Sequence, residues 1–287
     1  MNTIFKGIPM KRKIFFSILF LFSVFTNIQS QDIPYGINEK AGRYCNVGDA
    51  NIYYEIYGEG KPIVLLHGGF GYIDGFKKYI PVLSKKNKVI AIATRGYGKS
   101  EIGNKAYSYN LLAEDVKKVI EKECKDKAII IGHSDGAMIA YVVASKYPEV
   151  VSKVVAMGGP IGTSGYSKEG LDWLKYSNSK EFESYRPDLI KIMSRPERYN
   201  EFIENLMAMW KTSYILQFDE IKKIEIPVLL LLGDRDLFCT IDHIVQIYKS
   251  LPHAQLAVIP NSTHTDVSFR NTKILEEYIL PFIDNPK

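Results

Sequence analysis

Six short segments of this chain are apolar at most or all of their positions: residues 62–66, 88–93, 128–131, 150–156, 227–232 and 256–259. A β-strand sends successive side chains to opposite faces, so a strand that is apolar on both faces must be covered on both sides. Such strands are typical of a parallel sheet that carries helices on each face. The pattern therefore argues against an antiparallel sheet with one face open to water.

Helical periodicity fills the gaps between these runs. Apolar residues recur along one helix face over residues 108–124, 135–147, 241–250 and 272–283. Residues 51–57 are rich in aromatic and β-branched types, which favours one further strand. Alternation of strands and helices predicts a doubly wound, mostly parallel α/β fold with right-handed crossovers.

Residues 161–220 break this alternation, because they contain amphipathic helical stretches and no strand-like run. Both tryptophans of the chain, Trp173 and Trp210, lie in this segment. We predict that 161–220 is a helical cap inserted over the sheet edge. The core domain is then made of residues 41–160 and 221–287.

Residues 1–30 have the pattern of a signal peptide. Lys11, Arg12 and Lys13 precede an apolar run over 14–25, which is shorter than the ~20 residues that span a bilayer. A polar stretch follows, with the small Ser30 near a plausible cleavage point. An uncleaved anchor or a buried helix is the alternative. We expect export to the periplasm or the medium, with no stable membrane insertion after cleavage.

The charge of the chain argues against nucleic acid as a partner. The formal net charge is +5, and residues 1–30 hold four basic residues and no acid, so the remainder carries 5 − 4 = +1. A chain this close to neutral lacks the basic surface that nucleic acid requires. The three cysteines match no zinc motif and cannot build a disulfide framework, so at most one disulfide is expected.

The segment Gly132-His133-Ser134-Asp135-Gly136 has the form G-x-S-x-G and joins a predicted strand to a predicted helix. This turn is so tight that the residues two before and two after the serine must be small. The serine hydroxyl then projects above the sheet, and the next N–H points into the site from the helix N-terminus. The motif in this context predicts that Ser134 is a catalytic nucleophile.

On the basis of this motif and two further motifs, the chain resembles the α/β-hydrolase superfamily over about residues 41–287. His67-Gly68-Gly69 is similar to that family's H-G-x oxyanion loop, and residues 95–100 are similar to its R-G-x-G-x-S segment. The resemblance implies an oxyanion hole formed by the N–H groups of Gly69 and Asp135, with Phe70 as the alternative to Gly69. It also implies the chain order nucleophile, acid, histidine.

A serine needs a neighbouring imidazole to take its proton. His264 is the one histidine of the five that follows the last predicted strand at its carboxyl end. The side chain of His133 adjoins Ser134 but is expected to point away at the turn. Of the other three histidines, His67 belongs to the loop after an early strand, His243 begins a helix, and His253 precedes the last strand. We therefore predict His264 as the general base.

The acid is expected after a strand on the same edge of the sheet. The strand at 150–156 is followed by no carboxylate, whereas 227–232 leads into Gly233-Asp234-Arg235-Asp236. The family pattern G-x-x-D implies that Asp236 is the acid. Asp234 is the alternative, and otherwise it would brace the turn.

These residues predict a serine hydrolase that cleaves an ester or another acyl bond through a covalent acyl-enzyme. A serine nucleophile argues against the haloalkane dehalogenases and epoxide hydrolases, which have a similar fold but use an aspartate. The aromatic and methionine side chains of the cap favour small or medium apolar substrates in a pocket closed to bulk water. No metal-binding, nucleotide-binding or dinucleotide motif is present, so we expect no metal and no cofactor.

Two alternatives remain at this stage. One is an aminopeptidase similar to the proline iminopeptidases, whose loop reads H-G-G-P-G, although residues 67–71 lack that proline. A substrate ammonium would then be bound by acids of the cap: Glu181, Glu183, Glu201 and Glu204. The other is a ligand-sensing protein on a hydrolase scaffold. The sequence does not determine the oligomeric state.

Overall fold

The computed structural model describes residues 33–176, 181–211 and 215–286. The signal peptide predicted over 1–30 lies outside these ranges. No helix within them has the length and apolarity needed to cross a membrane. The three cysteines are free thiols.

The strands form one eight-stranded sheet in the order β1-β2-β4-β3-β5-β6-β7-β8. Strands β3 to β8 pair in parallel, whereas β1 and β2 join one edge antiparallel. The strands are β1 Gly42–Asn46, β2 Asn51–Tyr57, β3 Lys61–Leu66, β4 Asn87–Ile92, β5 Ala128–His133, β6 Val151–Met157, β7 Val228–Gly233 and β8 Ala254–Ile259. The predicted doubly wound, mostly parallel α/β fold is confirmed, and β1 is a strand that the sequence pattern did not indicate.

The two-sided burial of the strands explains why they are apolar at successive positions. In β3, Val64 and Leu66 belong to one hydrophobic core, and Ile63 and Leu65 belong to the core on the opposite face. Strand β4 divides its residues between the two cores in the same way. In these central strands, residues on both faces therefore pack in an apolar core.

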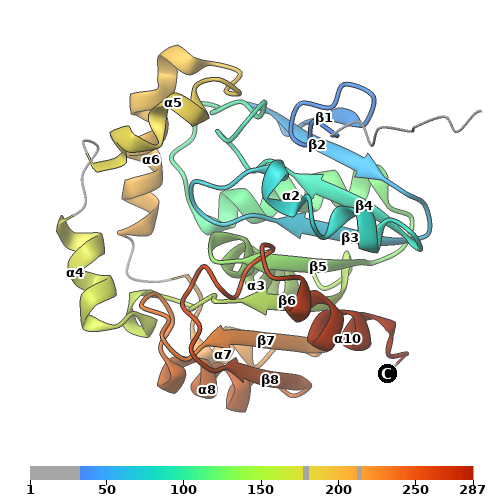
Figure 1. Ribbon diagram of the computed structural model, residues 1–287, viewed down its shortest axis with the longest axis vertical. Helices are drawn as coiled ribbons and strands as arrows, with labels where there is room; N and C mark the ends of the chain where they lie inside the picture. The colour runs from blue at the N-terminus through green and yellow to red at the C-terminus, as the bar shows by residue number, and fades with distance from the viewer. Residues whose placement is uncertain (1–32, 177–180, 212–214, 287) are drawn as a thin grey trace, which may run out of the picture. The chain divides into compact units, whose positions relative to one another are not determined.

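Helices cover both faces of the sheet (Figure 1). One core contains residues of α2 Tyr109–Glu123, α3 Asp135–Lys146, α7 Phe218–Ile221 and α8 Ile241–Ser250. The other contains residues of η1 Ile73–Phe76, α1 Ile80–Leu83, α9 Thr272–Ile274, the π-helical turn η5 Leu275–Ile279 and α10 Leu280–Asp284. Helices α2 and α8 begin at side-chain caps, where Ser108 and Thr240 accept hydrogen bonds from the N–H groups of Leu111 and His243.

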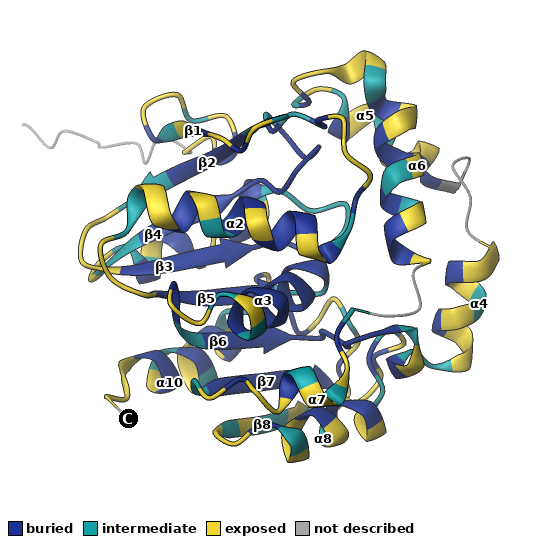
Figure 2. Cartoon of the chain, turned by 180° about the vertical axis from the view of Figure 1, so that it is seen from behind, coloured by how far each residue is buried: buried dark blue, intermediate teal, exposed yellow. Residues whose placement is uncertain are grey.

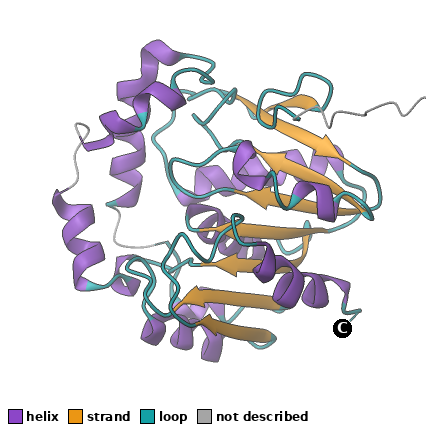
Figure 3. Cartoon of the chain, in the orientation of Figure 1, coloured by secondary structure: helices purple, strands orange, loops and turns teal. Residues whose placement is uncertain are grey.

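Between β6 and β7 the described residues form helices joined by loops, and they contain no strand. Before α7 it contains η2 Thr163–Gly165, α4 Lys168–Tyr176, η3 Glu181–Ser184, α5 Arg186–Leu189, η4 Pro196–Arg198 and α6 Tyr199–Trp210. Helices α4, α5 and α6 gather beyond the carboxyl ends of the parallel strands (Figures 1 and 3). Helix α6 buries Phe202, Ile203 and Leu206, while much of α4 is exposed (Figure 2). This segment therefore stands over the edge where doubly wound folds bind ligands.

Candidate active site

Ser134 lies in the turn that joins β5 to α3, and its backbone adopts φ +53° and ψ −120°. A positive φ is uncommon for a residue that has a Cβ atom, because the side chain crowds the backbone. The turn is held by a hydrogen bond from the Ser134 N–H to the carbonyl oxygen of Met157, at 2.9 Å. The strained geometry expected of the G-x-S-x-G turn is therefore present.

The two glycines of this turn are required by contacts between backbone segments. A Cβ atom on Gly132 would overlap the carbonyl oxygen of Gly136. A Cβ atom on Gly136 would overlap the carbonyl oxygen of Leu66, at the end of β3. The small residues that the motif demands thus allow α3 to begin directly against β3.

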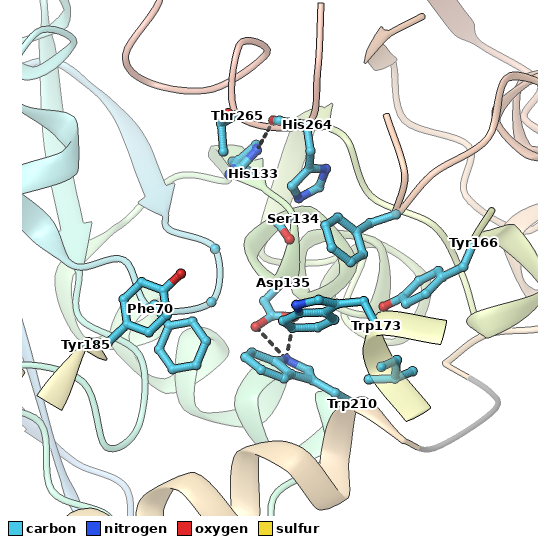
Figure 4. Close-up of a pocket in the computed structure, with 14 residues that line it drawn as sticks. Phe70, His133, Ser134, Asp135, Tyr166, Trp173, Tyr185, Trp210, His264 and Thr265 are labelled. Atoms are coloured by element: carbon cyan, nitrogen blue, oxygen red, sulfur yellow. Dashed lines mark hydrogen bonds between the residues drawn. The ribbon is translucent and has the colours of Figure 1, made fainter. Parts of the chain in front are cut away.

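His264 and Asp236 form a hydrogen-bonded pair, with 2.8 Å between Nδ1 and Oδ2. The other oxygen of Asp236 accepts the N–H groups of Phe238 and Cys239, at 2.8 and 3.0 Å. The carboxylate of Asp236 is fully buried, so these three donors replace water around its charge. Because Asp236 Oδ2 accepts the hydrogen bond from His264 Nδ1–H, it orients the imidazole, whose ring points toward Ser134 in Figure 4.

Asp234, the alternative acid, has a different environment. It is exposed to solvent, and its carboxylate accepts the N–H of Ser262 at 3.0 Å. Hydrogen bonds from the backbone of Asn261 and Ser262 lower the pKa of Asp234. The structure therefore pairs His264 with Asp236, while Asp234 braces the turn before His264.

His133 does not point away from the site, contrary to the expectation from its place in the turn. Its Nε2 lies 2.9 Å from the carbonyl oxygen of His264, and since a carbonyl only accepts, Nε2–H is the donor. Burial lowers the pKa of His133 to about 3, so its ring is neutral near neutral pH. His133 thus ties the segment that carries His264 to the turn that carries Ser134.

The loop after β3 is held by a buried, neutral histidine. The Nε2 atom of His67 accepts the N–H of Thr94 at 3.1 Å, so Nδ1 carries the proton and donates to the carbonyl oxygen of Gly68 at 2.8 Å. Burial lowers the pKa of His67 to about 4, which keeps this tautomer neutral. The loop conformation is thereby set before any substrate arrives.

Two backbone N–H groups beside Ser134 have no acceptor among the described residues: those of Gly69 and Asp135. The N–H of Phe70, the alternative donor, is already bonded to the hydroxyl oxygen of Tyr97 at 3.2 Å. Phe70 has φ +55°, and its ring stacks on Tyr185 with 4.4 Å between centroids. This geometry favours Gly69 over Phe70 as a donor to a bound oxyanion.

Ser134 and His264 line one cavity of about 230 Å³ (Figure 4). Its wall is mostly aromatic and is formed by Gly68, Gly69, Phe70, His133, Ser134, Asp135, Tyr166, Trp173, Leu174, Tyr185, Trp210, Phe238, His264 and Thr265. We expected a cap that closes the pocket to bulk water. Trp173 and Tyr185 are 41% and 48% exposed, however, so the pocket has an open aromatic rim.

The acids of the cap do not line this pocket in the described part of the chain. Glu183 pairs with Arg186 at 3.1 Å, Glu201 pairs with Arg198, and Glu204 is exposed. The side chain of Glu181 is outside the described part. The carboxylate in the pocket wall belongs instead to Asp135, which was expected to contribute only its backbone N–H to the site.

Sequence reasoning also missed the role of Gly158, which follows β6 with φ +60°. A Cβ atom there would lie 3.0 Å from both Asp236 Oδ2 and His264 Nδ1. Glycine thus leaves room for the pair. The sequence shows two glycines, Gly158 and Gly159, after the strand where a carboxylate was expected. The need for glycine at 158 follows only from the loops that carry Asp236 and His264, which meet there in the fold.

No described group of three or more His, Cys, Asp or Glu side chains is arranged to hold a metal ion.

The comparisons with known proteins agree with this architecture. Residues 61–190 match the family model described as the alpha/beta hydrolase fold. An uncharacterized hydrolase of Bacillus subtilis, YugF, is 25% identical over 84% of this chain and 97% of its own length. The 2-hydroxy-6-oxononadienedioate/2-hydroxy-6-oxononatrienedioate hydrolase 2 of Pseudomonas putida is 26% identical over 75% of this chain and 86% of its own.

Among solved structures, the meta-cleavage product hydrolase from Pseudomonas fluorescens IP01 superposes with a TM-score of 0.69 at 22% identity. That match covers 85% of this chain and 98% of the other. At this identity the likeness shows the fold alone. Together with the family-model match over residues 61–190, it shows that the chain has the α/β-hydrolase fold.

Proposed function

We propose that this protein is a serine hydrolase that cleaves an ester or another acyl bond of a small to medium substrate. Ser134 is the nucleophile, His264 the general base and Asp236 the acid that orients it. The observation that carries the proposal is the strained turn at Ser134 together with the 2.8 Å His264–Asp236 pair beside the same cavity. No cofactor is needed for this chemistry.

The proposed reaction has two halves. His264 Nε2 takes the proton of Ser134 Oγ as the oxygen attacks the acyl carbon, and the acyl oxygen becomes an anion stabilised by the N–H groups of Gly69 and Asp135. His264 then gives the proton to the leaving group, and the acyl group remains bound to Ser134 as an ester, the acyl-enzyme. Water attacks the acyl-enzyme, again with His264 as the base. The carboxylic acid product is released and Ser134 regains its proton from His264. Asp236 stabilises the imidazolium in both halves.

Active-site labelling tests the nucleophile. A serine-directed fluorophosphonate is expected to label the parent protein once, at Ser134, and Ser134→Ala is expected to lose both labelling and turnover. Ser145→Ala is the control, because Ser145 lies on α3, the helix that begins directly after Ser134, and its hydroxyl donates to the carbonyl oxygen of Glu220 in α7 at 3.4 Å. Labelling of Ser134→Ala at another residue would overturn the assignment. A panel of esters, thioesters, lactones, and aminoacyl and prolyl amides then identifies the acyl bond.

The segment 161–220 is proposed as the cap that selects the substrate. It contributes Tyr166, Trp173, Leu174, Tyr185 and Trp210 to the pocket wall, so its side chains bound the space beside Ser134. A turnover number well below that of esterases on every substrate of the panel would favour the alternative, a ligand sensor on a hydrolase scaffold.

We also propose that the protein is exported, on the basis of the basic and apolar segments within residues 1–30. Expression of the full chain, followed by N-terminal sequencing of the protein recovered outside the cytoplasm, tests this. Recovery of an uncleaved chain from the membrane fraction would support the anchor alternative instead.

A further inference from the structure

The pocket beside Ser134 contains a buried carboxylate that the proposed reaction does not use. Asp135 is 8% exposed and lines the cavity. Its Oδ1 accepts the hydroxyl of Tyr109 at 2.8 Å, and Trp210 Nε1–H donates to both oxygens, at 2.9 Å to Oδ2 and 3.1 Å to Oδ1 (Figure 4). The carboxylate is thus held in one orientation.

The hydrogen-bonding partners of Asp135 carry no positive charge, so its charge is offset only in part, by the N-terminus of α3 and by His264 when that imidazole is protonated. Both donors are neutral, and no lysine or arginine is among the described residues that line the cavity. Burial raises the pKa of Asp135, which reflects the cost of keeping a charge there. An asparagine oxygen could accept from the same two donors without that cost, so these hydrogen bonds alone do not explain an acid at this position.

The surroundings of this carboxylate suit an organic cation. Six aromatic side chains line the same cavity, and the faces of aromatic rings attract cations. A carboxylate has about four lone-pair sites, and the contacts with Tyr109 and Trp210 occupy three of them, which leaves capacity for one more donor. Water is the other available donor, but it does not neutralise the charge.

The position of the carboxylate indicates where such a cation would sit on a substrate. Asp135 directly follows Ser134, and consecutive Cα atoms are about 3.8 Å apart. Both residues also line the same cavity, so a substrate bound there can contact Ser134 and Asp135 at the same time. An ammonium group on the carbon next to the acyl carbon meets both requirements.

We propose that Asp135 binds the ammonium group of the substrate, so that the preferred acyl group is a small 2-aminoacyl group. This inference rests on the proposed serine hydrolase activity and names its substrate class. The same carboxylate repels an acyl group that carries a second carboxylate. Dioate substrates, of the kind for which the Pseudomonas putida relative is named, are therefore expected to be poor.

Two nearly isosteric esters test the proposal. Alanine benzyl ester carries an ammonium where 2-methylpropanoic acid benzyl ester carries a methyl group, and the leaving group is the same. The parent protein is expected to favour the alanine ester by roughly 10- to 100-fold in kcat/KM, the range for a hydrogen bond to a charged group. Asp135→Asn is expected to remove most of that ratio. Glu204→Gln, an exposed acid of α6, is the control and should leave the ratio unchanged.

A second measurement does not depend on how well Asp135→Asn folds. Alaninamide is expected to inhibit hydrolysis of the 2-methylpropanoic ester by the parent protein competitively, whereas 2-methylpropanamide is expected to inhibit far more weakly. Equal hydrolysis of the two esters, or equal inhibition by the two amides, would overturn the role of Asp135 and leave the hydrolase proposal intact. Failure of both esters to react, with no fluorophosphonate label on Ser134, would overturn the hydrolase proposal itself.

Discussion

Replacement of Gly158 by alanine isolates the requirement for space around the His264–Asp236 pair. The new Cβ atom would stand 3.0 Å from Asp236 Oδ2 and from His264 Nδ1, a distance at which the neighbours must move by a few tenths of an ångström. Those two atoms share the hydrogen bond that orients the imidazole. Gly158→Ala therefore acts on the geometry of the pair without changing either side chain.

Two effects of different size are expected. Alanine at φ +60° costs roughly 1–2 kcal/mol of folding free energy, which in a domain of this size lowers Tm by about 2–8 °C. Displacement of the imidazole by a few tenths of an ångström lowers kcat/KM further, on the order of 10-fold, because a shift near 1 Å in a reacting group costs about 100-fold.

Gly98→Ala separates these effects. Gly98 has φ +53°, and a Cβ atom there would meet only Ala93 Cβ at 3.7 Å, an ordinary contact. Thermal unfolding and ester hydrolysis of the two variants are the assays. Similar losses of Tm, with a loss of kcat/KM only in Gly158→Ala, are expected. If the two variants lose equal activity, or if Gly158→Ala keeps full activity, the steric argument is wrong.

Three further predictions follow from the site. Asp236→Asn is expected to lower kcat on the order of 10⁴-fold, as in comparable triads, whereas Asp234→Asn changes it by only a few-fold; the reverse order in steady-state kinetics would make Asp234 the acid. Burial holds the pKa of His67 and His243 at about 4 and that of His133 at about 3, below the unfolded value near 6.5. The unfolded chain therefore binds protons first, and urea unfolding is expected to show stability falling from about pH 6.5 toward pH 4, by up to about 1.4 kcal/mol per pH unit for each histidine; a flat profile contradicts this. p-Nitrophenyl butyrate is expected to exceed the palmitate ester in kcat/KM, because the cavity of about 230 Å³ cannot enclose a long chain, and a rate increase at a lipid interface would refute this.

Much of the fold was predictable from local patterns, because a strand buried on both faces leaves an apolar run and a helix leaves a 3.6-residue period. The strand predicted at 51–57 coincides with β2, and that predicted at 128–131 lies within β5. Strand β1 was not predicted, because it is a mostly exposed edge strand and core packing therefore does not require apolar residues along it. Its antiparallel pairing with β2 depends on a partner rather than on its own composition.

The sequence by itself determined the turn at Ser134, since the tight path between β5 and α3 demands glycines at fixed positions on either side. It also narrowed the acid to two aspartates after β7. Only the tertiary structure paired His264 with Asp236 and directed His133 onto the His264 segment, because these contacts join loops more than 20 residues apart in the chain. The same holds for the carboxylate of Asp135. Its burial depends on Trp210 of α6, 75 residues away, and no local pattern records which distant side chain will cover a charge.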